Sequence, residues 1–210
     1  MKREFHVRIC ESVGVRFPRA TRRNVYVRSE RAAQDVMETL RRLFGRLRLR
    51  INEAKSAIAH PWERSFLGYT FFVTKKQEVR RGISVKALCA MKDRVRRITR
   101  RTGGRSLTEV IEELKRYLPG WKNYFQLQQV GSKFRELDGW IRHRLRMLQL
   151  KHWKNAATVK RELRARGLTE AEANRVAGSL KSWWRNSAML LNKALPPKWF
   201  DAQGLPRLAT

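Results

Sequence analysis

Residues 131–154, GSKFRELDGWIRHRLRMLQLKHWK, carry a long helical pattern. Their large apolar residues recur three and four positions apart, which places them on one face of an α-helix: Phe134, Leu137, Ile141, Leu145 and Leu148. Basic residues occupy the other face, which is expected to meet solvent: Arg135, Arg142, Arg144, Arg146, Lys151 and Lys154. The stretch therefore predicts an amphipathic helix with one strongly basic side.

The helical periodicity extends from about residue 85 to about residue 205. Ser106 with Glu109, and Thr169 with Glu172, have the spacing of capping boxes and predict two helix starts. Helix ends or breaks are predicted at three places rich in glycine or proline: Gly103-Gly104, Pro119-Gly120 and Gly167. A final helix is expected to hold Trp183, Trp184, Leu190 and Leu191.

Residues 24–84 show short strand patterns around a single helix. Ser29 can cap a helix from about residue 30 to residue 45. Strands are expected at residues 25–27, 47–51, 66–73 and 79–84, the last two as a hairpin. Residues 1–23 show no sustained period, so we expect a loosely structured leader there. The fold class is therefore α+β: a small partial sheet with one helix over residues 24–84, then a mostly α-helical region over residues 85–205.

The charge of the chain favours a polyanionic partner. The 210 residues include 48 Lys and Arg against 18 Asp and Glu, a formal net charge of +30. This excess of positive charge is more than solubility needs, and the like charges repel one another in a compact state. Structured RNA or another nucleic acid is the expected partner. No apolar run is long enough to span a bilayer and no signal-peptide pattern is present, so we expect no membrane partner.

Cysteine, histidine and aspartate residues give no sign of redox or metal chemistry. Cys10 and Cys89 form neither a disulfide framework nor a CxxC pair, which fits a reducing cytoplasm. The expected compartment is a bacterial cytoplasm. Cys89 falls in an apolar helical phase and is expected in the core. The four histidines lack zinc spacing, and the four aspartates are isolated from one another in sequence. We expect no catalytic residue, no metal site and no resident cofactor.

Basic residues alternate with aromatic ones in the helical half, as in Trp121-Lys122-Asn123-Tyr124-Phe125. Cationic side chains can meet phosphates and aromatic faces can stack on unpaired bases, although amphipathic helices also bury aromatic residues in their cores. For a single aromatic residue the core is the better interpretation, whereas the basic face as a whole favours RNA. The expected RNA contacts are Arg142, Arg144, Arg146, Lys151, Lys154, Arg161, Arg164 and Arg185, with Trp121, Lys122 and Tyr124 supporting the same surface.

From residue 24 onward the chain resembles the later part of group II intron-encoded proteins, which are reverse transcriptases joined to a maturase domain. Three segments are similar to the end of the palm: NVYVRS at 24–29, LRINEAKS at 49–56 and FLGY at 66–69. Two more are similar to the thumb and maturase signatures: LPGWKNYF at 118–125 and LDGWIRHRLR at 137–146. The resemblance implies a partial palm over residues 24–84, a thumb and maturase domain over residues 85–205, and Lys55 near the bound nucleic acid. It also implies group II intron RNA as the partner, whose folding and splicing the protein would assist.

The chain departs from this family at the catalytic palm motif. The family places Tyr-Ala-Asp-Asp before the NVYV strand, where this chain reads FPRATRR at 17–23. Because two-metal phosphoryl transfer needs such carboxylates, Mg²⁺ is expected only for an intact polymerase site. We therefore expect a truncated reverse transcriptase without polymerase activity. Two alternatives stay open: an RNA-directed DNA polymerase that acts only with a complementing palm, and a generic basic nucleic-acid-binding protein.

Overall fold

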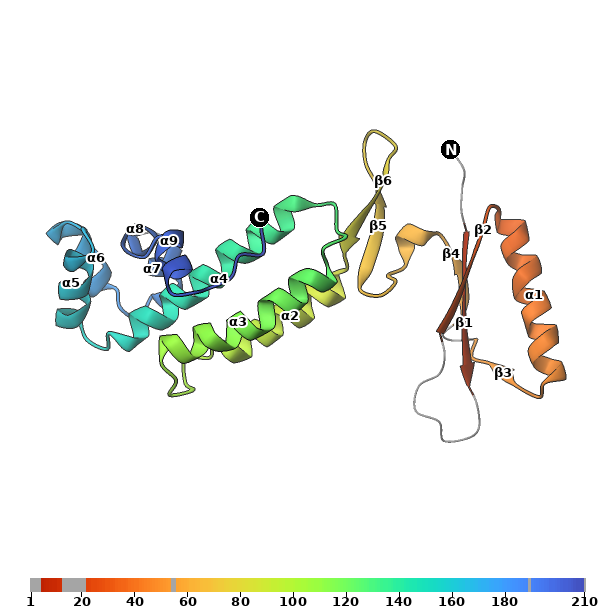
Figure 1. Ribbon diagram of the computed structural model, residues 1–210, viewed down its shortest axis with the longest axis horizontal. Coiled ribbons are helices and arrows are strands. Elements are labelled where there is room, and N and C mark those ends of the chain that lie inside the picture. The colour runs from red at the N-terminus through yellow and green to blue at the C-terminus, as the bar shows by residue number, and fades with distance from the viewer. Residues whose placement is uncertain (1–4, 13–21, 54–55, 189, 210) are drawn as a thin grey trace. The chain divides into compact units, whose positions relative to one another are not determined.

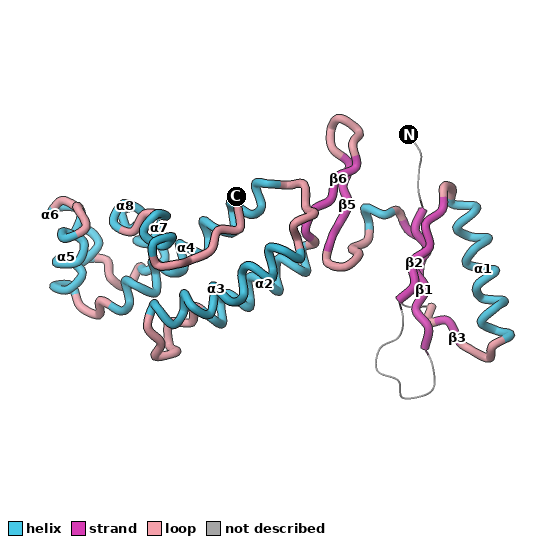
Figure 2. Tube along the Cα trace, in the orientation of Figure 1, coloured by secondary structure: helices cyan, strands magenta, loops and turns pink. Residues whose placement is uncertain are grey.

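The computed structural model describes residues 5–12, 22–53, 56–188 and 190–209. The chain divides into two compact units, Met1–Ser84 and Val85–Thr210. Strands occur in the first unit, and the described part of the second consists of helices and their connections (Figures 1 and 2). The α+β class predicted from the sequence is confirmed.

The first unit is built around strand β1 (Phe5–Ser12). This strand pairs antiparallel with β2 (Arg22–Val27), with β3 (Arg50–Ile51) and with β4 (Ala57–Ala59). Helix α1 (Glu30–Arg46) begins at Ser29, whose Oγ accepts a hydrogen bond from the backbone N–H of Ala32. The apolar face of α1 forms a small core with the sheet: Ala33, Met37 and Phe44, joined by Val25, Val27 and Ile58.

Two expectations for this unit were wrong. Residues 1–23 were expected to be loose, yet Phe5–Ser12 form the strand that joins the other three. In sequence, Phe5, Val7 and Ile9 alternate with His6 and Arg8, a short period-two pattern that a search for sustained periods overlooks. The strand expected at residues 47–51 is reduced to Arg50–Ile51, because Leu47 still caps α1 and Arg48 turns the chain at φ 56°.

The predicted hairpin is confirmed as β5 (Tyr69–Val73) and β6 (Val79–Ile83), which pair antiparallel. The short 3₁₀ helix η1 (Pro61–Glu63) precedes it. Leu67 and Gly68 both have positive φ, 49° and 78°, so the segment FLGY forms a tight turn. This turn is closed by two backbone hydrogen bonds between Phe66 and Tyr69.

The second unit contains three long helices, α2 (Val85–Ile98), α3 (Leu107–Tyr124) and α4 (Gly131–His152). Helix α4 contacts α3 and also α7 (Trp183–Ala188) and α8 (Leu190–Ala194). Helices α5 (Ala156–Ala165) and α6 (Glu170–Gly178) pack on each other, and α9 (Pro197–Ala202) follows α8. Both predicted capping boxes are confirmed, at Ser106 and at Thr169.

Three details of this unit differ from the sequence-based expectations. Helix α3 continues through Pro119 and Gly120, because one lost backbone hydrogen bond is outweighed by the burial of Leu114 and Leu118. Helix α2 ends at Ile98, before the two glycines expected to end it. Cys89 is exposed, since the buried face of α2 is formed by residues 91, 95 and 98.

A buried ionic network joins α4 to the end of the chain. The Asp138 carboxylate accepts hydrogen bonds from the backbone N–H groups of Leu208, at 3.0 Å, and Ala209, at 2.9 Å. It also pairs with Arg142 Nη1 at 3.2 Å, while Arg142 Nη2 donates to Asp201 Oδ1 at 2.9 Å. The C-terminal segment therefore runs back along α4 (Figure 1), with Leu205 and Leu208 buried.

Asp138→Ala is expected to lower the free energy of unfolding by about 3 kcal/mol, because it removes a charge partner of buried Arg142 and the acceptor of two backbone N–H groups. Urea denaturation of the purified chain measures this loss. Glu136→Ala is the matched control, since Glu136 is exposed and, among the residues that the structure describes, pairs only with Lys133 on the same helix. Its cost should be about 0.5 kcal/mol or less. Equal losses for the two variants would contradict the assigned role of Asp138.

Candidate nucleic-acid interface

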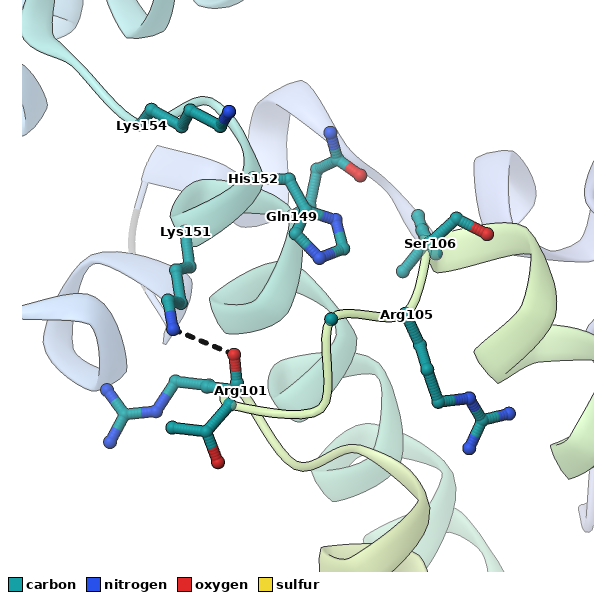
Figure 3. A pocket seen from close by; sticks show the side chains of 10 residues that line it. Arg101, Arg105, Ser106, Gln149, Lys151, His152 and Lys154 are labelled. Atoms are coloured by element: carbon teal, nitrogen blue, oxygen red, sulfur yellow. Dashed lines mark hydrogen bonds between the residues drawn. The ribbon is translucent and has the colours of Figure 1, made fainter.

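A basic surface groove of about 770 Å³ lies between the α2–α3 loop and the C-terminal end of α4. Five basic residues line it: Arg101, Arg105, Lys151, His152 and Lys154. None of the described residues that line the groove is acidic. Figure 3 shows the His152 ring between the α4 end that carries Lys151 and the backbone that leads to Ser106.

Local backbone geometry builds the two walls of the groove. On one side, Gly104 has φ +65°, a conformation that glycine adopts without strain, and it lets the loop turn back into the Ser106 cap of α3. On the other side, α4 ends at the buried Trp153, and Lys154 takes φ 58° directly afterwards. Lys154 is consequently exposed at the mouth of the groove.

The cations of the groove differ in the partners that they have within the protein. Arg105 pairs with Glu113 at 2.6 Å, and the Arg101 guanidinium lies 4.3 Å from the centre of the Trp183 ring. Lys151 Nζ donates to the backbone carbonyl of Arg101 at 2.8 Å, drawn as a dashed line in Figure 3. Within the described part of the chain, Arg101, Lys151 and Lys154 have no carboxylate partner. The groove therefore carries positive charge that the protein leaves uncompensated.

His152 is the titratable group inside this groove. Burial lowers the pKa of its imidazole below the ordinary value of 6.5, and the charge of Lys151 adds to the decrease. A hydrogen bond with the backbone of Arg105 acts in the opposite direction. The ring is therefore mainly neutral at pH 7, so the permanent charge of the groove comes from Lys and Arg.

Arg144 extends this positive surface along α4 toward α2. It is partly buried, and its Nε donates to Thr99 Oγ1 at 2.7 Å. Burial lowers the pKa of Arg144, and the charges of Arg96 and Arg101 lower it further. These like charges are close enough to repel one another, as expected for a surface that a polyanion covers.

Two expected RNA contacts are instead buried in the protein. Arg142 is 4% exposed and bound to Asp138 and Asp201, and Arg146 is 5% exposed, with its Nε donating to the backbone carbonyl of Leu195 at 2.9 Å. Burial, with the charge of Arg142, lowers the pKa of Arg146 to about 10. The expectation was wrong because α7, α8 and the C-terminal segment cover the side of α4 that the sequence pattern assigned to solvent.

The aromatic cluster near the end of α3 lies outside the groove. Trp121 packs on Phe125 and Phe134, with ring centres 4.8 and 6.0 Å apart. Lys122 Nζ donates to the backbone carbonyl of Arg207 at 3.2 Å, so it holds the C-terminal segment. Tyr124 is 55% exposed. Of these three expected contacts, Tyr124 presents the most accessible ring.

The remaining expected contacts are exposed but dispersed. Arg161 and Arg164 lie on α5, near Glu162 at 3.5 Å and Glu170 at 3.9 Å, and Arg185 lies on α7. Lys55 lies outside the described residues. Of all the expected contacts, the groove brings together Lys151 and Lys154. Sequence reasoning missed Arg101, Arg105 and His152, for which the Arg- and Gly-rich loop RRTGGR at 100–105 was the available signal.

The part of the chain that the structure describes offers neither a metal cluster nor a membrane-spanning helix. Over residues 5–12, 22–53, 56–188 and 190–209, no group of three or more His, Cys, Asp or Glu side chains is arranged to hold a metal ion. Within those same ranges, no helix has both the length and the apolar character required to cross a membrane.

The lowered pKa of His152 predicts a loss of stability in acid. The folded state holds the His152 proton more weakly than the unfolded chain does. The free energy of unfolding is therefore unaffected by this group well above pH 6.5, and it decreases as the pH falls through and below that value. His152→Gln should therefore lose less stability than the parent chain between pH 7.5 and pH 5.5. Urea midpoints at the two pH values test this, and an identical pH dependence of the two proteins would contradict it.

A comparison with known protein families matches the segment of the chain that forms this groove. Residues 88–167 match the family model described as group II intron, maturase-specific domain. No curated protein matches the chain. The matched segment includes α3, α4, α5 and every residue that lines the groove. Residues 88–167 of this chain are therefore similar to the group II intron maturase-specific domain.

Proposed function

We propose that the chain binds group II intron RNA through the basic groove and assists the folding of that RNA for splicing. The observation that carries this proposal is the position of the groove within the maturase-specific domain, together with its uncompensated cations Arg101, Lys151 and Lys154. The intron RNA itself would supply the splicing chemistry. The protein would supply a surface that stabilises the folded RNA.

The chemistry of the groove suits a phosphate backbone. Lys151 and Lys154 present compact ammonium charges, and Arg101 offers a planar guanidinium. Cations that neutralise phosphates release counterions, which gives binding free energy that decreases as salt rises. A folded RNA brings several phosphates close together, so a concave basic surface favours folded RNA over an extended strand.

The proposal for residues 24–84 rests on sequence resemblance alone. We assign residues 24–84 to the end of a reverse-transcriptase palm, on the sequence resemblance of the segments NVYVRS, LRINEAKS and FLGY. FPRATRR stands where the family has its paired aspartates, so the chain by itself would have no polymerase activity and no need for Mg²⁺. A reducing cytoplasm is the proposed compartment.

The direct test is a binding titration with two RNAs across a salt series. The purified chain is titrated with the intron RNA that neighbours its gene and with an unrelated structured RNA of equal length. The proposal predicts tighter binding to the intron RNA and a preference that persists as salt rises. Equal and steeply salt-dependent binding to both would support the generic basic protein instead. DNA synthesis on a primed RNA template with Mg²⁺ would contradict the proposed absence of polymerase activity.

Removing two charges from the groove should weaken RNA binding more than removing two charges elsewhere. Lys151→Gln with Lys154→Gln should lower the affinity for the intron RNA at least about tenfold at 0.1 M salt and reduce the salt slope by about 1.5. The matched control is Lys160→Gln with Lys181→Gln, both exposed and outside the groove, with the same change in net charge. Equal losses for the two double variants would show that net charge matters and the groove does not.

A further inference from the structure

Trp140 on α4 lies among three cations from two helices. The Arg144 guanidinium is 5.5 Å from the centre of the ring, the Arg96 guanidinium is 5.7 Å from it and Lys92 Nζ is 5.9 Å from it. The ring is partly exposed. A small cavity of about 120 Å³ opens beside it, lined by Leu88, Lys92, Lys133, Glu136, Leu137 and Trp140. A partly exposed aromatic ring therefore has positive charge on several sides.

Local carboxylates neutralise only part of this charge. Arg96 pairs with Asp93 at 2.6 Å, and Lys133 pairs with Glu136 at 3.0 Å. Lys92 and Arg144 make no ion pair with any residue that the structure describes. Instead, Arg144 is oriented by Thr99 Oγ1. Two unpaired cations thus remain beside the ring.

A purely structural role does not explain why three cations gather around one ring. A single cation over a tryptophan face is mildly stabilising, but every further like charge repels those already there. The pKa of Arg144 is lowered, mainly by its burial and further by the charges of Arg96 and Arg101. An anion placed beside Lys92 and Arg144 would relieve the repulsion, and the partly exposed ring offers a stacking surface.

The position of Trp140 on α4 connects it with the groove. Trp140, Arg144 and Lys151 are four and seven residues apart, which places them along one side of the helix. From Trp140 to Lys151 the helix rises about 16 Å, roughly the length of five stacked nucleotides in one strand. Thr99 and Arg101, which follow α2 in the chain, accept hydrogen bonds from Arg144 and Lys151 on that side. The uncompensated cations therefore form a continuous line from Trp140 to the groove.

We propose that Trp140, Lys92 and Arg144 form a subsite for single-stranded RNA, in which an unpaired base stacks on the Trp140 ring and the adjoining phosphates contact the two cations. This subsite deepens the proposed function and rests on RNA being the ligand. It adds recognition of an unpaired nucleotide to the phosphate contacts of the groove, since only an unpaired base exposes its face for stacking.

The test uses two short RNA probes and a ring-removing variant. The probes are a 12-nucleotide single strand with 2-aminopurine at its centre and a 12-base-pair duplex of the same sequence, both at 0.1 M salt. Trp140→Leu should weaken single-strand binding about tenfold and change duplex binding less than twofold. Binding to the parent chain should quench the 2-aminopurine fluorescence, and Trp140→Leu should abolish the quenching.

Rescue and control variants separate stacking from folding. Trp140→Phe should restore most of the single-strand affinity, because a smaller aromatic ring still stacks. Trp62→Leu, which removes the ring that stacks on His60 in the first unit, should leave both affinities unchanged. If Trp140→Leu unfolds, Lys92→Gln takes its place. It should lower single-strand affinity about fivefold and flatten its salt dependence, whereas Lys86→Gln on the same helix should have no effect.

The outcomes distinguish this subsite from the proposed function. Equal weakening of both probes by Trp140→Leu, or unquenched fluorescence with the parent chain, would overturn the subsite even if the intron RNA is still preferred. Selective loss of the single strand with Trp140→Leu would support the subsite even if the chain shows no preference for the intron RNA. In that case the proposed maturase function would be contradicted while the subsite is supported.

Discussion

The ionic network of Asp138, Arg142 and Asp201 determines how the second unit is put together. Asp138 lies one helical turn before Arg142 on α4, and both are bound to a C-terminal segment more than 50 residues away in sequence. Removing one partner from a buried ion pair leaves an uncompensated charge in the interior, so the network requires α9 and the last residues to stay in place. Lys122, which bonds to the backbone of Arg207, and the ion pair of Arg207 with Asp201 fasten the same segment from outside.

This network also sorts the charges of α4 into two groups. Arg142 and Arg146 are buried against α7, α8 and the C-terminal segment. Arg142 pairs there with two carboxylates, and Arg146 donates to a backbone carbonyl and lies 5.5 Å from the centre of the Phe200 ring. Arg144 and Lys151 face the α2 side, where their partners are a hydroxyl and a carbonyl without negative charge. The first group stabilises the fold, while the second leaves a positive surface that includes the groove and Trp140. A helix with basic residues around most of its circumference can thus combine a structural and a binding role.

Local signals in the sequence were enough for most helix starts and for the hairpin. Ser29, Ser106 and Thr169 each cap a helix through contacts within four residues, so their effect is readable from spacing. Strand β1 was missed because its pairing with β2, β3 and β4 is non-local and its pattern is short. The burial of Arg142 was missed because hydrophobic periodicity finds one apolar face and cannot show that a distant segment covers a polar one. The groove joins loop 100–105 to residues 149–154, and no spacing rule connects segments so far apart.

The most direct measurement of the central claim is hydrogen–deuterium exchange of the full chain with and without the intron RNA. If the uncompensated cations on the α2 side of α4 form the binding surface, RNA should slow exchange most in residues 101–106, the loop that lines the groove, and in residues 149–155. The C-terminal segment, residues 203–209, should exchange equally in both samples. Slowed exchange confined to α5, α6 or the first unit, with the groove loop unchanged, would contradict the account.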